Sequence, residues 1–591
     1  MVFSISESRT SESPFVEAGV TITNNVKRIV ATKPTVRAEN MAKLQSLWFV
    51  LLTRCQSRWR QYAGILALSL ILGGCEVGQA LPTITMFEKS SYFGGAVADE
   101  PRAALVARDI LAAGGSAADA AVALFFTLAV TYPSTASLGS GGVCLIYYPD
   151  EEQGDITEVI EFYANAASPT TALPRRPNSV PGSVRGMYAL HARYGRLPWS
   201  QLLAPAEAYA RLGHQISRAL ARDLQLAGAA LFDDPEMRKI FLKSDGKILE
   251  ESQRVKQLEL GAVLSQLRIK GAGDFYNGTV AKTLSKKARE ADGALSMEEL
   301  RGFRPVWRES VAIPFGYNVL YTAPPPAAGG ITAAAIFHLL TEDDRYLDAP
   351  AAERDHLMVE VSKRAFADRQ LWLEGENAPA LDIARLNASM LSYSSVRATE
   401  LEALTPEPQR RLENPASTSF VTLDRTGLTI SCGATMNNLF GTGRIVPGTG
   451  ILLAASPTSA ISSGSSLAPV TVVNHNTSQL FFAAGSVGGA AAPSALAGVM
   501  RSALLENILL RQAVSAPRLH HGGAPDSVLT EFNFSEDRRA KLEQLGHQVV
   551  TVKEIGRINS IHCPGGAPRS PHSCSFESDR RGFGLASGGE F

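Results

Sequence analysis

A helix without charge constrains the fold of this 591-residue chain more than any other segment. Residues 120–130 read AAVALFFTLAV, and none of them is ionisable. The stretch is too short to span a bilayer, which takes about 20 apolar residues, and a helix that is apolar on all sides has to be buried. Ser116 and Asp119 precede it in the pattern of a capping box. We therefore expect a helix that is packed inside a large protein core.

Helical and β-like segments alternate along the rest of the chain. Apolar residues spaced three to four apart predict helices at 101–113, 202–212, 280–289 and 331–340. Apolar runs bounded by turn residues predict three hairpins: 143–148 with 156–162, 417–423 with 428–434, and 470–473 with 480–484. This order predicts an α+β fold with sheets inside and helices outside.

The first 75 residues contain an extension, at 1–40, and the pattern of an export signal, at 41–75. Residues 1–40 are polar and aperiodic, and we expect a disordered or non-native extension there, with the true start at Met41. A basic region, an apolar core at 62–72 and the ending LGGC follow within 41–75. The ending resembles a bacterial lipobox, which implies cleavage before Cys75 and acylation of its thiol. We expect a lipid-anchored periplasmic protein, on the outer membrane of a Gram-negative bacterium; an uncleaved signal anchor is the alternative.

Charge and histidine placement exclude several classes of function. Lys and Arg number 57, as do Asp and Glu, so the chain lacks the basic field of a nucleic-acid-binding protein. No metal-ligand spacing can be completed, and we expect neither a metal nor a cofactor. The adjacent His520 and His521 point in different directions on any regular element, so we interpret them as structural.

Cysteine usage is compatible with export. Cys563 and Cys574 flank a loop of Pro, Gly and Ser, where a disulfide can form in an oxidising compartment. Cys144 and Cys432 instead lie within apolar, strand-like runs.

Five segments, spread in order from about residue 93 to the C-terminus, together resemble the gamma-glutamyltransferase family. They read GGSAADAA at 114–121, VPG at 180–182, PPP at 324–326 with GG at 329–330, FADR at 366–369, and PRLHH at 517–521. The resemblance implies a four-layer αββα N-terminal-nucleophile hydrolase sandwich. In that family an inactive precursor cleaves itself, and the new N-terminal Thr of the small subunit is the nucleophile.

Ser417 occupies the position of that Thr, ten residues before the hairpin glycine Gly427. The resemblance implies cleavage between Ala416 and Ser417, with a large subunit at 76–416 and a small one at 417–591. A serine hydroxyl can attack the preceding carbonyl, and the freed α-amine, with a pKa of about 7.7 to 8.0, can then act as general base. Thr418 is the adjacent candidate, but its side chain would face the other side of the strand. Without the resemblance, Ser417 reads as the first residue of a strand.

The resemblance extends to the supporting groups. Thr435 and Asn437, in the segment TMNNLFGTG at 435–443, match residues that position the hydroxyl and the amine. The backbone N–H groups of Gly488 and Gly489 match an oxyanion hole. A serine pair, Ser465 and Ser466, matches residues that contact the carboxylate of the substrate.

Two expected substrate-binding positions depart from the family. Tyr163, in the segment EFYA at 161–164, stands where the family has an Arg that clamps the α-carboxylate. Ser459, in the segment ASPTSA at 455–460, stands where the family has an acidic residue for the α-amino group. Neither side chain replaces a charged clamp. The residues expected to cleave a peptide bond are therefore better preserved than those expected to bind the glutamyl group.

These patterns predict a self-processing hydrolase or acyltransferase. Its expected substrates are small amides or peptides, among them γ-glutamyl compounds such as glutathione. One alternative is an amidase or acylase for a different acyl group. The other is a non-catalytic lipoprotein that retains the fold.

Overall fold

A computed structural model describes residues 94–589, except 151, 153, 169–173, 343, 374–415 and 458–463. The chain divides into two units, Met1–Phe87 and Glu88–Phe591, and every described residue belongs to the second. The predicted extension, the predicted signal with Cys75, and Ser459 therefore lie outside the described residues. Within the described part of the chain, no helix combines the length and apolar character needed to cross a membrane.

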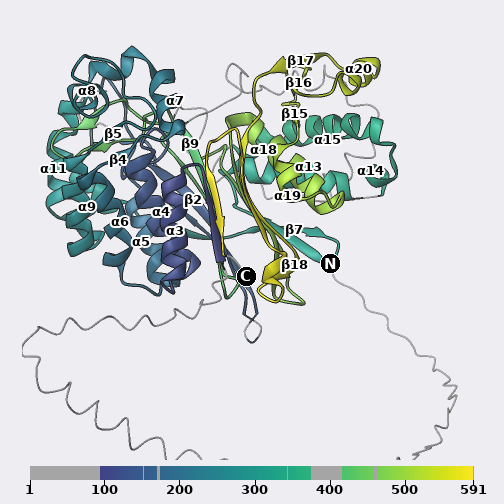
Figure 1. Cartoon of the computed structure of the whole chain (residues 1–591), viewed down its shortest axis with the longest axis horizontal. Helices are drawn as coiled ribbons and strands as arrows, with labels where there is room; N and C mark the ends of the chain where they lie inside the picture. The colour runs from purple at the N-terminus through teal and green to yellow at the C-terminus, as the bar shows by residue number, and fades with distance from the viewer. Residues whose placement is uncertain are drawn as a thin grey trace, which may run out of the picture. The chain divides into compact units, whose positions relative to one another are not determined.

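Two largely antiparallel sheets form the centre of the second unit (Figure 1). The strands of the seven-stranded sheet are, in spatial order, β20 (Leu585–Gly588), β1 (Gly94–Ala98), β9 (Ser417–Asp424), β10 (Thr429–Thr435), β2 (Gly141–Tyr148), β3 (Ile156–Glu161) and β6 (Val306–Glu309). Those of the six-stranded sheet are β19 (Ser575–Ser578), β18 (Arg557–Ala567), β14 (Gln479–Val487), β13 (Ala468–Asn474), β8 (Asn318–Thr322) and β7 (Val311–Phe315). Smaller sheets join β11 (Ile445–Val446) to β12 (Ile451–Leu452), β4 (His214–Gln215) to β5 (Arg254–Val255), and β15 (Leu519–His520) to β16 (Val528–Glu531) and β17 (Val549–Val552).

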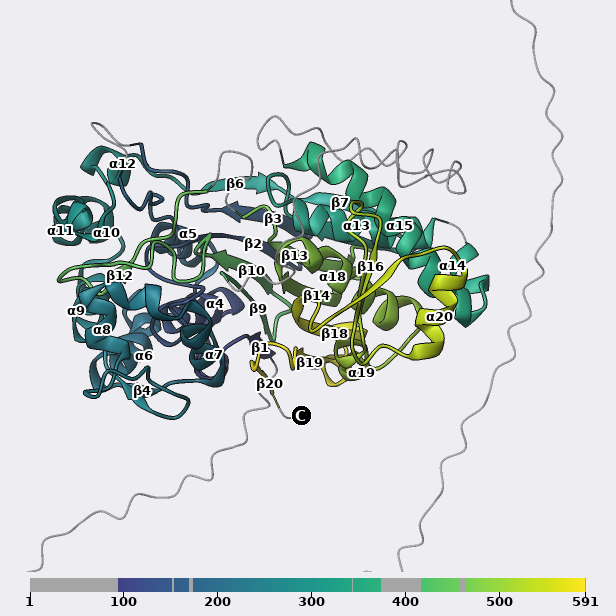
Figure 2. The same ribbon diagram turned by 90° about the horizontal axis from the view of Figure 1, so that it is seen from above.

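Helices cover the outer face of each sheet, so the layers follow the order αββα (Figures 1 and 2). On the side of the seven-stranded sheet lie α3 (Pro101–Ala112), α4 (Ala117–Thr131), α5 (Ser183–Tyr194), α6 (Trp199–Leu212), α7 (Arg218–Ala227), α8 (Pro235–Phe241), α9 (Leu258–Lys270), α10 (Gly273–Asn277), α11 (Thr279–Lys287) and α12 (Met297–Gly302). On the other side lie α13 (Ala328–Thr341), α14 (Arg345–Asp348), α15 (Ala351–Trp372), α18 (Ala492–Met500), α19 (Leu510–Ser515) and α20 (Glu536–Gln544). The predicted fold class is confirmed.

The uncharged helix predicted from the sequence is α4, and all of its residues are buried. Its N-terminus carries the predicted capping box, with Ser116 accepting from the N–H of Asp119 and Asp119 accepting from that of Ser116. The same Asp119 oxygen also accepts from the backbone N–H groups of Arg196 and Leu197, just before α6. One carboxylate thus fixes both the start of α4 and the segment that leads into α6.

The three predicted hairpins are present. They are formed by β2 with β3, by β9 with β10, and by β13 with β14. Gly427, in the turn between β9 and β10, has the positive φ of 88° that its place in the sequence predicts. The face-to-face contact of the two sheets brings β14 over β9, where Ser419 Oγ donates to the carbonyl of Gly485 at 3.0 Å.

Two disulfides link the described cysteines. Cys563–Cys574 is the pair that the sequence indicated. Cys144–Cys432 was not predicted, because its cysteines lie 288 positions apart. They become neighbours only when β2 and β10 pair with these two residues directly opposite each other.

Candidate functional site

Ser417 is the first residue of β9, and its side chain is only 1% exposed. Thr435 lies directly opposite it on β10, and Ser417 Oγ donates to Thr435 Oγ1 at 3.1 Å. The carbonyl oxygen of the preceding Ala416 accepts two hydrogen bonds, from Met436 N–H at 3.0 Å and from Thr435 Oγ1 at 3.4 Å. The pairing of two strands thus places a buried hydroxyl beside the peptide bond that it is expected to attack.

Thr435 connects the hydroxyl of Ser417 to that carbonyl. Its own oxygen is fixed by a third contact, from the backbone N–H of Asn437 at 3.0 Å. Donors on a carbonyl oxygen draw electron density from the carbon and stabilise the negative charge that forms when a nucleophile adds. The arrangement therefore favours attack of the Ser417 hydroxyl on the carbonyl carbon of Ala416.

Asn437 holds the turn that follows β10. Its backbone has a positive φ of 60°, which is uncommon for a residue other than glycine. Its side-chain amide donates to the carbonyl of Ala455 at 2.7 Å and to Ser179 Oγ at 3.4 Å. These contacts attach the turn to the segment just before residues 458–463. The predicted role of Asn437 toward the α-amine stays a prediction.

The two candidate nucleophiles face different groups. Thr418 Oγ1 donates to Asp99 Oδ2 at 2.9 Å, and Asp99 is completely buried. Asp99 also accepts from the backbone N–H of Ser419 and from the side chain of Asn559. The hydroxyl of Thr418 therefore belongs to a buried polar network that holds β9, while that of Ser417 faces Thr435 and Ala416. This geometry favours Ser417 as the nucleophile.

Gly488 and Gly489 form the junction between β14 and α18. Gly488 has a φ of 134°, and a Cβ there would lie 2.7 Å from the Cα of Gly556. Gly489 has a φ of 65° and opens the short 3₁₀ turn η5 (Gly489–Ala491), so its N–H has no acceptor within that turn. Only glycine satisfies both the backbone conformation and the close packing at Gly488.

A buried arginine, Arg557, brings this junction close to the candidate nucleophile. It lies opposite Val487, the residue just before Gly488, and its guanidinium donates to the carbonyl of Ser417 at 3.3 Å. The sequence did not single out Arg557 or Asp99, because neither belongs to a local motif. Both are distant from β9 in the chain, since Asp99 follows β1 and Arg557 is the first residue of β18.

Three of the expected substrate-binding residues lie close to one another. The ring of Tyr163 packs against Gly464, whose positive φ of 86° and contact with the ring leave no room for a side chain. Ser465 and Ser466 follow directly, and the carbonyl of Ser465 accepts from Gly329 N–H at the start of α13. The structure therefore brings together three of the four predicted residues, and the fourth, Ser459, lies outside the described residues.

The hydroxyl of Tyr163 is buried and has no hydrogen-bond partner among the described residues. Burial, and then the charge of Glu161, raise its pKa well above the usual value, so it stays neutral. Arg308 is a cation in this neighbourhood, and one of its nitrogens lies 4.0 Å from Glu161. A neutral hydroxyl thus lies at the position where the resemblance to the family places a guanidinium.

The two adjacent histidines face different partners, as expected. His520 contacts Ser494 at 2.8 Å, and His521 contacts Asp526 at 3.0 Å. Burial, with the charge of His521, lowers the pKa of His520 to about 3. Burial, with the charge of Lys363, lowers that of His521 to about 4.

The αββα layers, with a buried hydroxyl at the first residue of a central strand, define an N-terminal-nucleophile hydrolase. The family described as Gamma-glutamyltranspeptidase matches residues 103–588, and the chain belongs to this family of enzymes.

Proteins with similar sequences align with most of this chain. The glutathione hydrolase proenzyme of Pseudomonas aeruginosa is 30% identical over 540 residues, which cover 83% of this chain and 94% of that protein. The capsule biosynthesis protein CapD proenzyme of Bacillus anthracis is 31% identical over 367 residues, or 62% of this chain and 65% of that protein. Among solved structures, a cephalosporin acylase from Bacillus halodurans matches with a TM-score of 0.70 at 21% identity, over 87% of this chain and 99% of that one. This last likeness concerns the fold.

Substitution of Gly488 by Ala is expected to disturb the junction. The added Cβ collides with Gly556 in a backbone conformation that Ala rarely adopts, so the variant should lose about 1–3 kcal/mol of stability. The measurement is the thermal unfolding midpoint of the purified protein. Gly498→Ala in α18 is the matched control, because a Cβ there meets nothing within 4 Å. Equal midpoints for the two variants would contradict the close packing.

Proposed function

We propose that this chain is the precursor of a self-processing amide hydrolase or acyltransferase whose nucleophile is Ser417. The observation that carries the proposal is the buried contact of Ser417 Oγ with Thr435, next to an Ala416 carbonyl that two donors polarise. The relatives named as proenzymes support it, since the names of both the glutathione hydrolase and CapD proteins describe precursors.

In the processing step, Ser417 Oγ bonds to the carbonyl carbon of Ala416 and loses its proton through the contact with Thr435. The peptide C–N bond then breaks, and the nitrogen of Ser417 takes up a proton and becomes a free α-amine. Water hydrolyses the resulting ester, which leaves a carboxylate on Ala416 and restores the hydroxyl of Ser417.

In turnover, the free amine of Ser417 accepts the hydroxyl proton while Oγ attacks the amide carbon of a substrate. The N–H groups of Gly488 and Gly489 stabilise the tetrahedral oxyanion. The leaving amine departs with the proton, and an ester of Ser417 remains. Water or a second amine then takes the acyl group, which gives hydrolysis or transfer respectively.

The processing step predicts two fragments, and the disulfide pattern sharpens the test. At the mean residue mass of this 63.1-kDa chain, portions 75–416 and 417–591 weigh roughly 37 and 19 kDa. Cys144 and Cys432 lie on opposite sides of the cleavage point, so the fragments should separate on a denaturing gel only after reduction. N-terminal sequencing of the smaller fragment should begin with Ser417.

Two variants discriminate between the candidate nucleophiles. Ser417→Ala should abolish both processing and turnover, while Thr418→Ala should lose the contact with Asp99 but still be cleaved. Cleavage that survives in Ser417→Ala, or stops only in Thr418→Ala, contradicts the proposal. A wild-type chain that remains a single band under reducing conditions favours the non-catalytic alternative.

The substrate class of the proposal is γ-glutamyl compounds such as glutathione, used with low efficiency. The observation that favours the second candidate, an acylase for another acyl group, is the neutral hydroxyl of Tyr163, which is buried without a hydrogen-bond partner among the described residues. Loss of one partner from a buried charge pair costs about 2–5 kcal/mol. This corresponds to a factor of roughly 30 to several thousand in kcat/KM.

A comparison of two chromogenic anilides tests the substrate class. If no charged group recognises the α-amino acid head, kcat/KM for the γ-glutamyl anilide should lie within about tenfold of that for the glutaryl anilide, which lacks the amino group. Tyr163→Phe should raise KM by about tenfold and leave kcat nearly unchanged if the hydroxyl binds substrate. A strong preference for the γ-glutamyl anilide would argue against the acylase. An unchanged KM in Tyr163→Phe would show that the hydroxyl of Tyr163 does not bind substrate.

We propose further that the protein is exported and anchored by a lipid on Cys75. The signal pattern of residues 41–75 supports this, as do the two disulfides, which are bonds typical of oxidising compartments. In a Gram-negative host, Cys75→Ala should move the protein from the membrane fraction to a soluble fraction. Cys55→Ala, which precedes the apolar core of the signal, is the control and should stay with the membrane. A Cys75→Ala protein that remains in the membrane would overturn the lipid anchor.

A further inference from the structure

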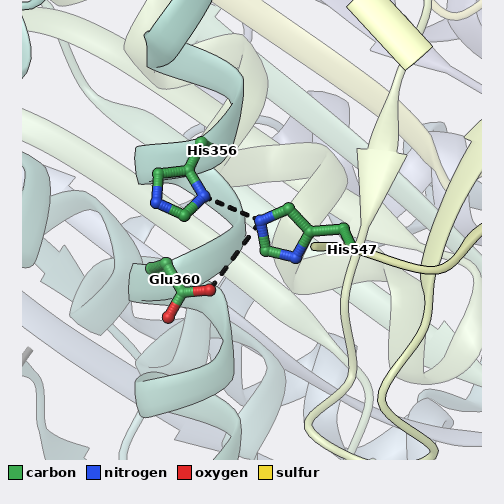
Figure 3. A group of neighbouring side chains, drawn as sticks. All are labelled: His356, Glu360 and His547. Atoms are coloured by element: carbon green, nitrogen blue, oxygen red, sulfur yellow. Dashed lines mark hydrogen bonds and ion pairs between the residues drawn. The ribbon is translucent and has the colours of Figure 1, made fainter. Parts of the chain in front are cut away.

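Three side chains with metal-binding atoms converge on the outer face of α15 (Figure 3). His356 and Glu360 come from α15, and His547 comes from the turn between α20 and β17. His356 Nδ1 lies 2.7 Å from His547 Nε2, which in turn lies 3.9 Å from Glu360 Oε1. These three form the one such group among the described residues, and their ligand atoms all lie within 4.8 Å of one another.

The helix supplies two of the three positions through its periodicity. Residues four apart lie on the same face of a helix, so the side chains of His356 and Glu360 project together. Two imidazoles and one carboxylate are a common donor set for zinc. Four ligands at Zn–N distances of about 2.0–2.1 Å lie about 3.3 Å apart at the corners of a tetrahedron. The observed 2.7 and 3.9 Å lie on either side of this value, and the third pair of ligand atoms lies within 4.8 Å, so side-chain rotations would bring the three atoms to it.

We propose that His356, Glu360 and His547 bind a divalent transition-metal ion of the zinc type, with water as the fourth ligand. In the absence of an ion, the short contact between the two rings is an N–H···N hydrogen bond, in which one nitrogen keeps its lone pair. When the ion binds, that proton moves through solvent to the outer nitrogen of the ring that carried it, so both facing nitrogens offer a lone pair to the ion and Glu360 adds a third donor.

The surroundings of Glu360 are suited to a ligating carboxylate. Lys363 Nζ lies 3.1 Å from Glu360 Oε1 and 3.1 Å from Asp526 Oδ1. Carboxylates that ligate metals are usually fixed by a hydrogen bond from a neighbouring group. Asp526 balances the ammonium charge of Lys363, so the charge of Glu360 remains for a cation.

The site joins the two portions of the proposed precursor. His356 and Glu360 precede the expected cleavage point, and His547 follows it. The group lies between α15 and the segment after α20, in the outer helical layer, whereas Ser417 lies in the seven-stranded sheet. An ion there would hold the α20–β17 segment against α15, which is a structural role and does not depend on the activity of Ser417.

Zinc uptake by tag-free, full-length protein tests this inference. Protein stripped with a chelator should take up one equivalent of Zn²⁺ in equilibrium dialysis, and its unfolding midpoint should rise. His547→Ala and His356→Gln should each weaken binding by more than about tenfold and remove the thermal shift. His356→Gln keeps a polar side chain at a half-buried position, so it serves if His547→Ala does not fold.

His338→Ala is the matched control. His338 near the end of α13 and Glu342 just after it have the same four-residue spacing and lie 3.2 Å apart, but the described residues supply no third ligand atom to this pair. This variant should retain the full equivalent of zinc. Failure of the wild-type protein to take up zinc would overturn the proposal. So would uptake that is equal in His356→Gln, His547→Ala and the wild type.

Discussion

The pairing of β9 with β10 is the interaction on which the candidate site depends. Its register sets Ser417 opposite Thr435, and it leaves the carbonyl of Ala416 facing the turn that follows β10. On its other edge β10 pairs with β2, where the Cys144–Cys432 disulfide links the two strands covalently. A slip of one residue between β9 and β10 would turn every side chain to the opposite face. It would therefore exchange the environments of Ser417 and Thr418.

Buried polar groups hold that register against such a slip. Asp99 accepts from Thr418 and Ser419, and Asn559 donates both to Asp99 and to the carbonyl of Ser419. In a region of low dielectric, a polar group that loses its partner is costly, so a network that is satisfied in one register disfavours the others. The groups come from β9, from β18 and from Asp99, the residue just after β1, so the network also binds the two facing sheets together.

Local patterns in the sequence predicted those parts of the fold that depend on interactions between residues close together in the chain. The charge-free stretch of α4 at residues 120–130, its capping box and the three hairpins depend on residues within a few positions of each other. The Cys144–Cys432 disulfide, Asp99 and Arg557 depend on strands that become neighbours only in the folded chain. The same holds for the group formed by His356, Glu360 and His547. The resemblance to a family supplied Tyr163, Ser465 and Ser466, whose proximity no periodicity indicated.

The division between preserved and altered positions has a physical basis. The groups proposed to cleave a bond are a hydroxyl, backbone N–H groups and carbonyls, and strand pairing positions them whatever the neighbouring side chains are. Recognition of an amino acid head instead requires charged side chains, and at Tyr163 the charge is absent while the side chain stays neutral. A free carboxylate that binds beside Tyr163 exchanges its hydration for a neutral hydroxyl and not for a cation. The scaffold can therefore retain acyl transfer while its preference moves toward acyl groups with less charge, because the two functions rest on different kinds of interaction.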